Sequence, residues 1–88
     1  MAEQTILSPN NTVETADLYL AAYFQSIGAE MFGCTRREGR VYFGFHSPEG
    51  KTIDVRAAWM AFNTDQATVK ANTYAQAVKT LKNMVHTA

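Results

Sequence analysis

The segment TADLYLAAYFQSIG, residues 15–28, constrains the fold more than any other, because as a helix it would be apolar on nearly every side. Thr15 can cap this helix, and Gly28 can end it in the left-handed conformation that glycine adopts easily. Its strongly polar positions are Asp17, Gln25 and Ser26. A helix with so little polar surface must be covered on two sides by the rest of the chain, or must take part in an interface.

Two short runs after this helix predict an antiparallel hairpin. Residues 29–35 (AEMFGCT) and 40–47 (RVYFGFHS) are rich in aromatic and β-propensity side chains, and Gly39 between them tolerates the positive φ of a tight turn. Side chains alternate along a strand, so Tyr42 and His46 should point away from the core. The core side of the second strand is expected to carry Val41, Phe43 and Phe45. A lone hairpin is marginal in water, so a helix or a further strand should cover its exposed edge.

Two more helices are predicted in the second half of the chain. Residues 52–62 (TIDVRAAWMAF) fit both an alternating strand and a helix that Thr52 would cap. We favour the helix, because the alanines and Met60 of this segment form helices more readily than strands. Residues 72–86 (NTYAQAVKTLKNMVH) predict a helix more clearly, since apolar side chains recur at helical spacing from Tyr74 onward.

Together these elements predict a small α+β fold in the order α-β-β-α-α, with a two-stranded antiparallel hairpin packed on helices. At 88 residues the chain should form a single domain, residues 1–88, because two half-size domains would each need disulfides or a metal. Residues 1–13 are expected to form an extended or flexible tail. The single cysteine favours a reducing, cytoplasmic location, and the sequence contains neither a signal peptide nor a run long enough to span a membrane.

The pattern DLYLAAYFQSIGAE, then GRVYFGF, then VKANTYAQAVKTLKNM resembles a family of small uncharacterised domains found in bacteria and their phages. The resemblance covers roughly residues 15–85 and rests on the YLAAY helix, the RVYF strand, the AAWMAF segment and the final YAxAxxxLK helix. It implies a small intracellular α+β domain encoded by a bacterium or a phage. It brings no assigned activity and no catalytic residue.

Candidates for catalysis or metal binding are few. Cys34, which we expect on a buried strand, and the two histidines, His46 and His86, lie in unrelated stretches without the spacing of metal ligands or of a nucleophile and its base. No glycine-rich phosphate loop is present. We therefore expect a protein that is not an enzyme and that needs neither a cofactor nor a metal.

Binding to a protein partner is our leading interpretation of the sequence. Large apolar side chains exceed the places where a small fold can bury them, and the candidate interaction surface consists of Leu18, Trp59 and Phe62. A homodimer would bury such groups, and a compact monomer could bury them unaided. The sequence leaves these two alternatives open.

The alternative function is binding of single-stranded nucleic acid at the tip of the hairpin. Arg36, Arg37 and Arg40 could neutralise phosphates there while Tyr42 offered a ring for a base to stack on. Eight basic and eight acidic residues cancel overall, so such binding would depend on this local cluster. A third interpretation makes the tip a structural turn, with Gly39 at positive φ and the arginines held in water.

Overall fold

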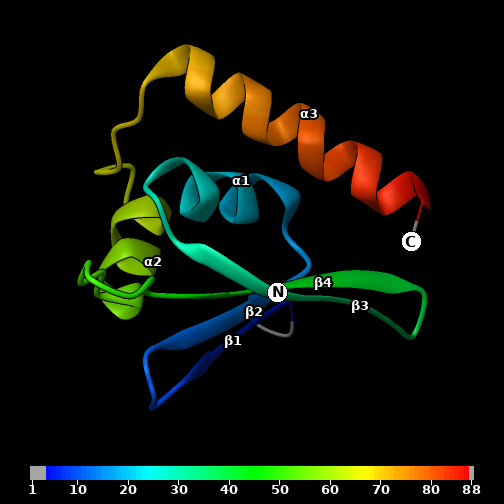
Figure 1. Ribbon diagram of the computed structural model, residues 1–88, viewed down its shortest axis with the longest axis horizontal. Coiled ribbons are helices and arrows are strands. Elements are labelled where there is room, and N and C mark those ends of the chain that lie inside the picture. The colour runs from blue at the N-terminus through cyan, green and yellow to red at the C-terminus, as the bar shows by residue number, and fades with distance from the viewer. Residues whose placement is uncertain (1–3, 88) are drawn as a thin grey trace.

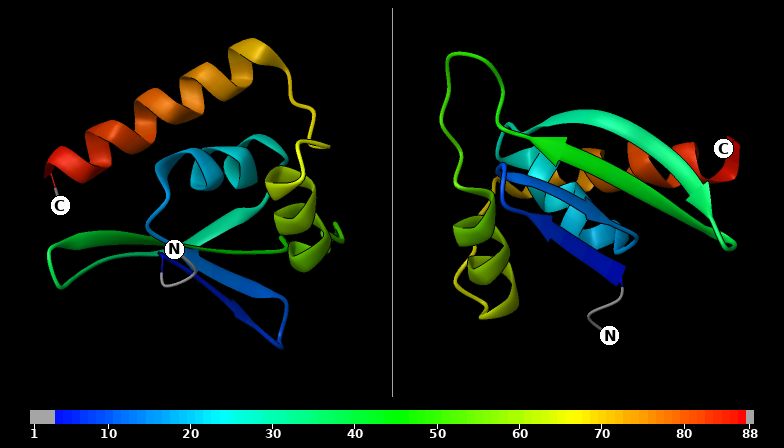
Figure 2. Two further views of the ribbon diagram at one scale, coloured as in Figure 1. Left: turned by 180° about the vertical axis from the view of Figure 1, so that it is seen from behind. Right: turned by 90° about the horizontal axis from the view of Figure 1, so that it is seen from below.

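A four-stranded antiparallel sheet with the strand order β1-β2-β4-β3 forms one layer of the computed structural model, which describes residues 4–87 (Figure 1). Helix α1 lies on one face of the sheet, and α3 lies across α1, so the layers are sheet, α1 and α3. In the right-hand view of Figure 2, from below, the strands lie in front of α1 and α3, and α2 lies beside the sheet. The elements of the described residues are β1 (Thr5–Ser8), β2 (Thr12–Thr15), α1 (Leu18–Ser26), β3 (Glu30–Arg37), β4 (Arg40–His46), α2 (Val55–Asn63) and α3 (Ala71–Thr87). The fold is therefore α+β, in one small domain.

The order of elements differs from the predicted α-β-β-α-α, because a strand pair precedes the first helix. β1 and the first half of β2 occupy the segment expected to be an extended or flexible tail, whose residues 1–3 lie outside the described part. β2 pairs with β4, with Val13 opposite Phe45, and so supplies the cover that the edge of the predicted hairpin required. Val13 is fully buried, and this burial fixes the pair in place. Within the described residues, the sheet accordingly has four strands and not two.

Helix α1 begins two residues later than predicted, and its cap is Asp17 and not Thr15. The Asp17 carboxylate accepts hydrogen bonds from the backbone N–H groups of Tyr19 and Leu20, whereas Thr15 belongs to β2. Gly28 follows the helix at φ +98°, as its sequence position predicted. Most of the helix is buried between the sheet and α3, through Leu20, Ala21, Ala22, Tyr23 and Phe24. Of the two explanations for its apolar surface, the structure shows the two-sided cover.

The core forms between α1 and the inner face of the sheet. The ring of Phe24 stacks on that of Phe45 with 5.9 Å between centroids. Val41, Phe43 and Phe45 face this core, which confirms the alternation predicted for β4. Leu81 from α3 is fully buried against the opposite side of the same cluster. α3 thus completes the core.

Helix α2 confirms the helical alternative for the segment 52–62, but Asp54 caps it in place of Thr52. Its start is held by Asn11, the residue that closes the β1–β2 turn at φ 64°. The Asn11 amide donates to the carbonyl of Ile53 over 2.8 Å, and its oxygen accepts from the N–H of Val55 over 2.9 Å. The unpredicted hairpin therefore positions the second helix as well as covering β4.

Candidate binding groove

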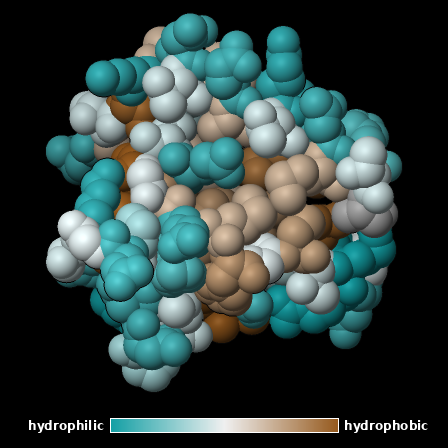
Figure 3. Space-filling model, viewed as in Figure 1, coloured by the Kyte–Doolittle hydropathy of each residue, from teal (hydrophilic) through white to brown (hydrophobic). Residues whose placement is uncertain are grey.

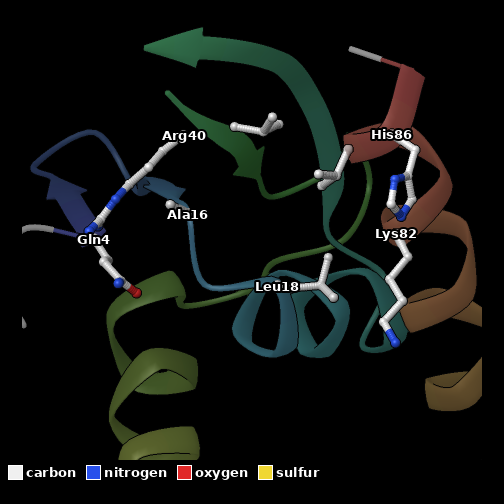
Figure 4. Close-up of a pocket in the computed structure, with 8 residues that line it drawn as sticks. Gln4, Ala16, Leu18, Arg40, Lys82 and His86 are labelled. Carbon is white, nitrogen blue, oxygen red and sulfur yellow. The ribbon is translucent and has the colours of Figure 1, made fainter. Parts of the chain in front are cut away.

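A groove of about 530 Å³ lies between the C-terminal half of α3 and the start of β4 (Figure 4). It exists because α3 has 17 residues and α1 has nine. At 1.5 Å per residue the two helices are about 25 Å and 14 Å long, so the last turns of α3 extend past the start of α1 toward the β3–β4 hairpin (Figure 1). The space beneath this overhang is the groove, and its volume lies within the range typical of ligand sites.

The floor of the groove is apolar. It is formed by Ala16, Leu18, Val41 and Val85. Val41 is buried at 6% exposure, while Leu18 and Val85 are half-buried and pack against the core. On the face of the molecule seen in Figure 1, hydrophobic side chains gather near the middle and hydrophilic side chains surround them (Figure 3). An apolar ligand group that entered the groove would leave water on contact with this floor.

The walls of the groove carry basic side chains. Arg40 lies on one side, and Lys82 and His86, one helical turn apart on α3, lie on the other, with Leu18 between them (Figure 4). All three are exposed. No carboxylate among residues 4–87 forms an ion pair with any of them. The groove therefore favours negative charge on both of its sides.

Two charged side chains next to the groove are engaged in contacts within the protein. Asp17 lies between two lining residues in the sequence, but its carboxylate accepts the backbone N–H groups of Tyr19 and Leu20 and is engaged in capping α1. Arg36 reaches the overhanging end of α3, where its Nη2 donates to the carbonyl of Val85 over 3.4 Å. A cation there also offsets the negative end of the helix dipole. The hairpin and α3 are thus linked beside the groove.

The three arginines of the hairpin do not act as one cluster. Arg36 contacts α3, and Nη2 of Arg37 is 3.1 Å from Oε1 of Glu14, whereas Arg40, the cross-strand partner of Arg37, lines the groove. The turn itself is formed by Glu38 at φ 52° and Gly39 at φ 80°. Positive φ at Gly39 confirms the prediction for that position. The arginines are exposed, but Arg36 and Arg37 contact other parts of the protein and are not held in water alone.

Tyr42 lies on the face of the sheet that the described helices leave uncovered. The guanidinium of Arg37 sits over its ring, 4.3 Å from the centroid. Phe32 shares this face and lies over Gly44, where an added β-carbon would be 2.6 Å from the Phe32 ring. The carboxylates of Glu14 and Glu30 belong to the same face. The ring of Tyr42 is therefore covered by Arg37, and neither Tyr42 nor Phe32 lines the groove.

The predicted interaction surface of Leu18, Trp59 and Phe62 is divided among three places. Leu18 lines the groove, and Trp59 lines a separate cavity of about 490 Å³ together with Leu7 and Leu20. The Phe62 ring packs against the ring of Tyr23 at 5.6 Å. All three are half-buried against the core. Of these residues, the structure assigns only Leu18 to the groove.

The residues weighed for catalysis or metal binding also lie apart. Cys34 was expected on a buried strand, but it is exposed, because β3 is an edge strand and its second half is not covered. His46 lies 3.7 Å from Glu30 on the uncovered face of the sheet, whereas His86 lines the groove. Within residues 4–87, no three His, Cys, Asp or Glu side chains come close enough to hold a metal ion.

In the same range, no helix has the length and hydropathy needed to cross a membrane.

Most of the groove could not be identified from the sequence. Gln4 and Ala16 belong to the segment before α1, and Lys82 and Val85 lie on a helix that was predicted only from its apolar stripe. Lys82 and His86, four residues apart with Val85 between them, did offer a local signal: a lysine and a histidine beside an apolar side chain on one helix face. Only the structure, in which the end of α3 extends past α1, shows that these two side chains border a groove.

Comparisons with models of protein families, with curated proteins and with solved structures found no significant match to this chain. The resemblance to small bacterial and phage domains therefore stays a prediction.

Proposed function

We propose that this protein is a non-enzymatic binding domain whose site is the groove between α3 and the start of β4, and that the groove takes a segment of a protein partner. The observation that carries this proposal is the combination of an apolar floor with cations on both walls, in a recess of about 530 Å³. Hydrophobic contact supplies most of the free energy of protein association, and charged rims supply orientation and selectivity. This groove offers both.

The structure gives single-stranded nucleic acid less support. A single-strand site combines cations with exposed rings on which bases stack. Here Arg40, Lys82 and His86 surround aliphatic side chains, and Tyr42 faces the other side of the sheet with Arg37 over its ring. Arg37 is in turn paired with Glu14. The experiments described below therefore also measure binding of a nucleic acid.

Self-association stays a prediction, but one of its reasons is gone. The apolar helix that suggested a homodimer is covered by the sheet and by α3 within one chain. The β4 edge of the predicted hairpin is paired with β2, whereas β3 stays an edge strand. Sedimentation equilibrium distinguishes a 9.8 kDa monomer from a dimer of twice that mass.

The proposal is tested by selecting random peptides of about twelve residues on the immobilised full chain, and by measuring how the selected peptides bind to variants of the groove. Val85→Trp fills the groove from its floor, and Lys82→Trp blocks it from an exposed position that the core does not need. Val69→Trp, an exposed site before α3, is the matched control. Circular dichroism and thermal melts verify that each variant folds.

The proposal is supported if the selected peptides bind the wild type and the Val69→Trp control but bind both groove variants at least about tenfold more weakly. A tenfold loss of affinity corresponds to about 1.4 kcal/mol. A selection that yields no binder, or binders that both groove variants still hold, would overturn it. If Val85→Trp fails to fold, the affinity of the peptides for Lys82→Trp alone decides between these outcomes.

A further inference from the structure

We infer that the partner segment is short and acidic, with one or two apolar side chains flanked on both sides by carboxylates. This inference rests on the proposed function and adds the chemistry of the occupant. It follows from the placement of charge around the groove, since Arg40 stands on one wall and Lys82 and His86 on the other, with Leu18 between them (Figure 4). An occupant with carboxylates on one side only would leave one cationic wall unmatched.

The dimensions of the groove limit the length of the occupant. Lys82 and His86 are four residues apart, which corresponds to about 6 Å along α3. An extended peptide rises about 3.3 Å per residue, so two to three of its residues span this wall. The floor between the walls then takes one or two apolar side chains. Acidic residues immediately before and after them come within reach of Arg40 and Lys82.

The charges on the walls are available to a partner. Arg40 and Lys82 are exposed and have no ion pair within residues 4–87, so a carboxylate that binds them displaces water and not an internal acid. Arg37 differs, because Glu14 already neutralises it. Lys70, just before α3, is also exposed but lies outside the groove, and it provides a matched control for Lys82.

Two other anionic partners fit the groove less well. A nucleic acid would bring phosphates to the cations, but the floor is aliphatic, and among the lining residues only His86 offers a ring for a base to stack on. An anionic membrane needs apolar side chains that project outward from the surface, whereas here the floor is recessed and Val41 is buried. A peptide places both apolar and acidic groups where this groove needs them.

Fluorescence anisotropy with a defined peptide tests the inference on the full-length chain. The probe is a labelled ten-residue peptide with Leu-Phe at its centre and four glutamates on each side. One control peptide has glutamine in place of every glutamate, and a second has Gly-Gly in place of Leu-Phe. A ten-nucleotide thymidine oligomer is the fourth probe. The proteins are the wild type, Arg40→Glu, Lys82→Glu and the control Lys70→Glu.

We expect the acidic apolar peptide to bind at least about tenfold more tightly than each control peptide and than the oligonucleotide. Arg40→Glu and Lys82→Glu should each weaken it about fivefold or more, because each replaces an attraction by a repulsion, and Lys70→Glu should change it less than twofold. The weakening should shrink at high salt.

Equal binding of the glutamate and glutamine peptides would overturn the inference, as would tighter binding of the oligonucleotide. So would an equal loss of affinity in Lys70→Glu, because it would show a response to net charge and not to the groove. If the peptides from the selection depend on Val85 and Lys82 but carry no acidic residues, the proposed function stands and this inference alone fails.

Discussion

The guanidinium of Arg37 lies over the ring of Tyr42, 4.3 Å from its centroid, and is paired with Glu14 across 3.1 Å. This contact joins β2, β3 and β4 on the face of the sheet opposite α1. It also occupies the ring and the cation that a nucleic-acid site at the hairpin would need. The side chain at the tip of the hairpin thus has a structural role that the sequence did not reveal.

Arg37→Ala should therefore lower the free energy of unfolding more than Arg40→Ala does. The Arg37 contacts combine a cation–π interaction and an exposed ion pair, together about 1 kcal/mol, whereas Arg40 lines an open groove and should cost less than about 0.5 kcal/mol. Urea unfolding followed by tryptophan fluorescence measures both. Equal costs for the two variants would show that the Arg37 stack contributes nothing to stability.

Gly39→Ala should destabilise the protein by about 1 kcal/mol or more. Gly39 has φ +80°, a conformation in which a β-carbon is strained even though the space around this position is open. Gly33→Ala is the matched control on the same hairpin, because its surroundings are also open and its φ is not positive. Thermal melts compare the two, and a Gly33→Ala variant that lost as much stability would rule out backbone strain as the cause.

Asn11→Ala should cost about 2 kcal/mol or more, since it removes both hydrogen bonds to the start of α2 and places alanine at φ 64°. Asn11→Gly removes the same bonds but tolerates that φ, so it should cost less. Denaturant unfolding of the pair separates the hydrogen bonds from the backbone conformation. If both variants were as stable as the wild type, the Asn11 bridge would not be what positions α2.

Tyr74 should make stability depend on pH in the alkaline range. Its hydroxyl donates to the carbonyl of Tyr19 over 3.2 Å. Partial burial, followed by the nearby charges of Asp17 and Tyr19, raises the pKa of Tyr74 above its ordinary value of 10.0. The folded state then holds the proton more tightly than the unfolded state. This contribution is complete below pH 10.0 and is lost as the pH rises through the raised folded pKa.

Tyr74→Phe should remove that contribution. We expect the difference in unfolding free energy between wild type and Tyr74→Phe to be constant below about pH 9 and to narrow as the pH rises above 10. Urea unfolding across this pH range measures the difference. A constant gap throughout would show that the Tyr74 pKa is the same in the folded and unfolded states.

Local patterns in the sequence predicted local features of the fold. The alternation of Val41, Phe43 and Phe45 fixed which side of β4 faces the core, because strand periodicity is set by neighbouring residues alone. Gly39 marked the turn for the same reason. The β1–β2 pair escaped prediction because four-residue strands show too few alternations to stand out, although the Pro9–Asn11 stretch was a turn signal.

The candidate site depends on relationships that no local pattern contains. Arg40 was predicted as a nucleic-acid contact and Leu18 as part of an apolar interface, yet both line the same groove. Their meeting depends on the length by which α3 extends past α1 and on where the sheet places the start of β4. The sequence therefore identified Arg40 and Leu18 as candidate binding residues, but it did not show that they line one groove.

The most direct test of the groove is a titration of isotopically labelled protein with the glutamate-flanked Leu-Phe peptide, followed by amide chemical shifts in NMR spectra. We expect the largest changes at Leu18, Val41, Lys82 and Val85, with little change at Thr12, Phe32 or Tyr42 on the uncovered face of the sheet. Shifts confined to that face, or no shifts at peptide concentrations up to about 1 mM, where even weak complexes of about 4 kcal/mol form, would contradict the assignment of the binding site.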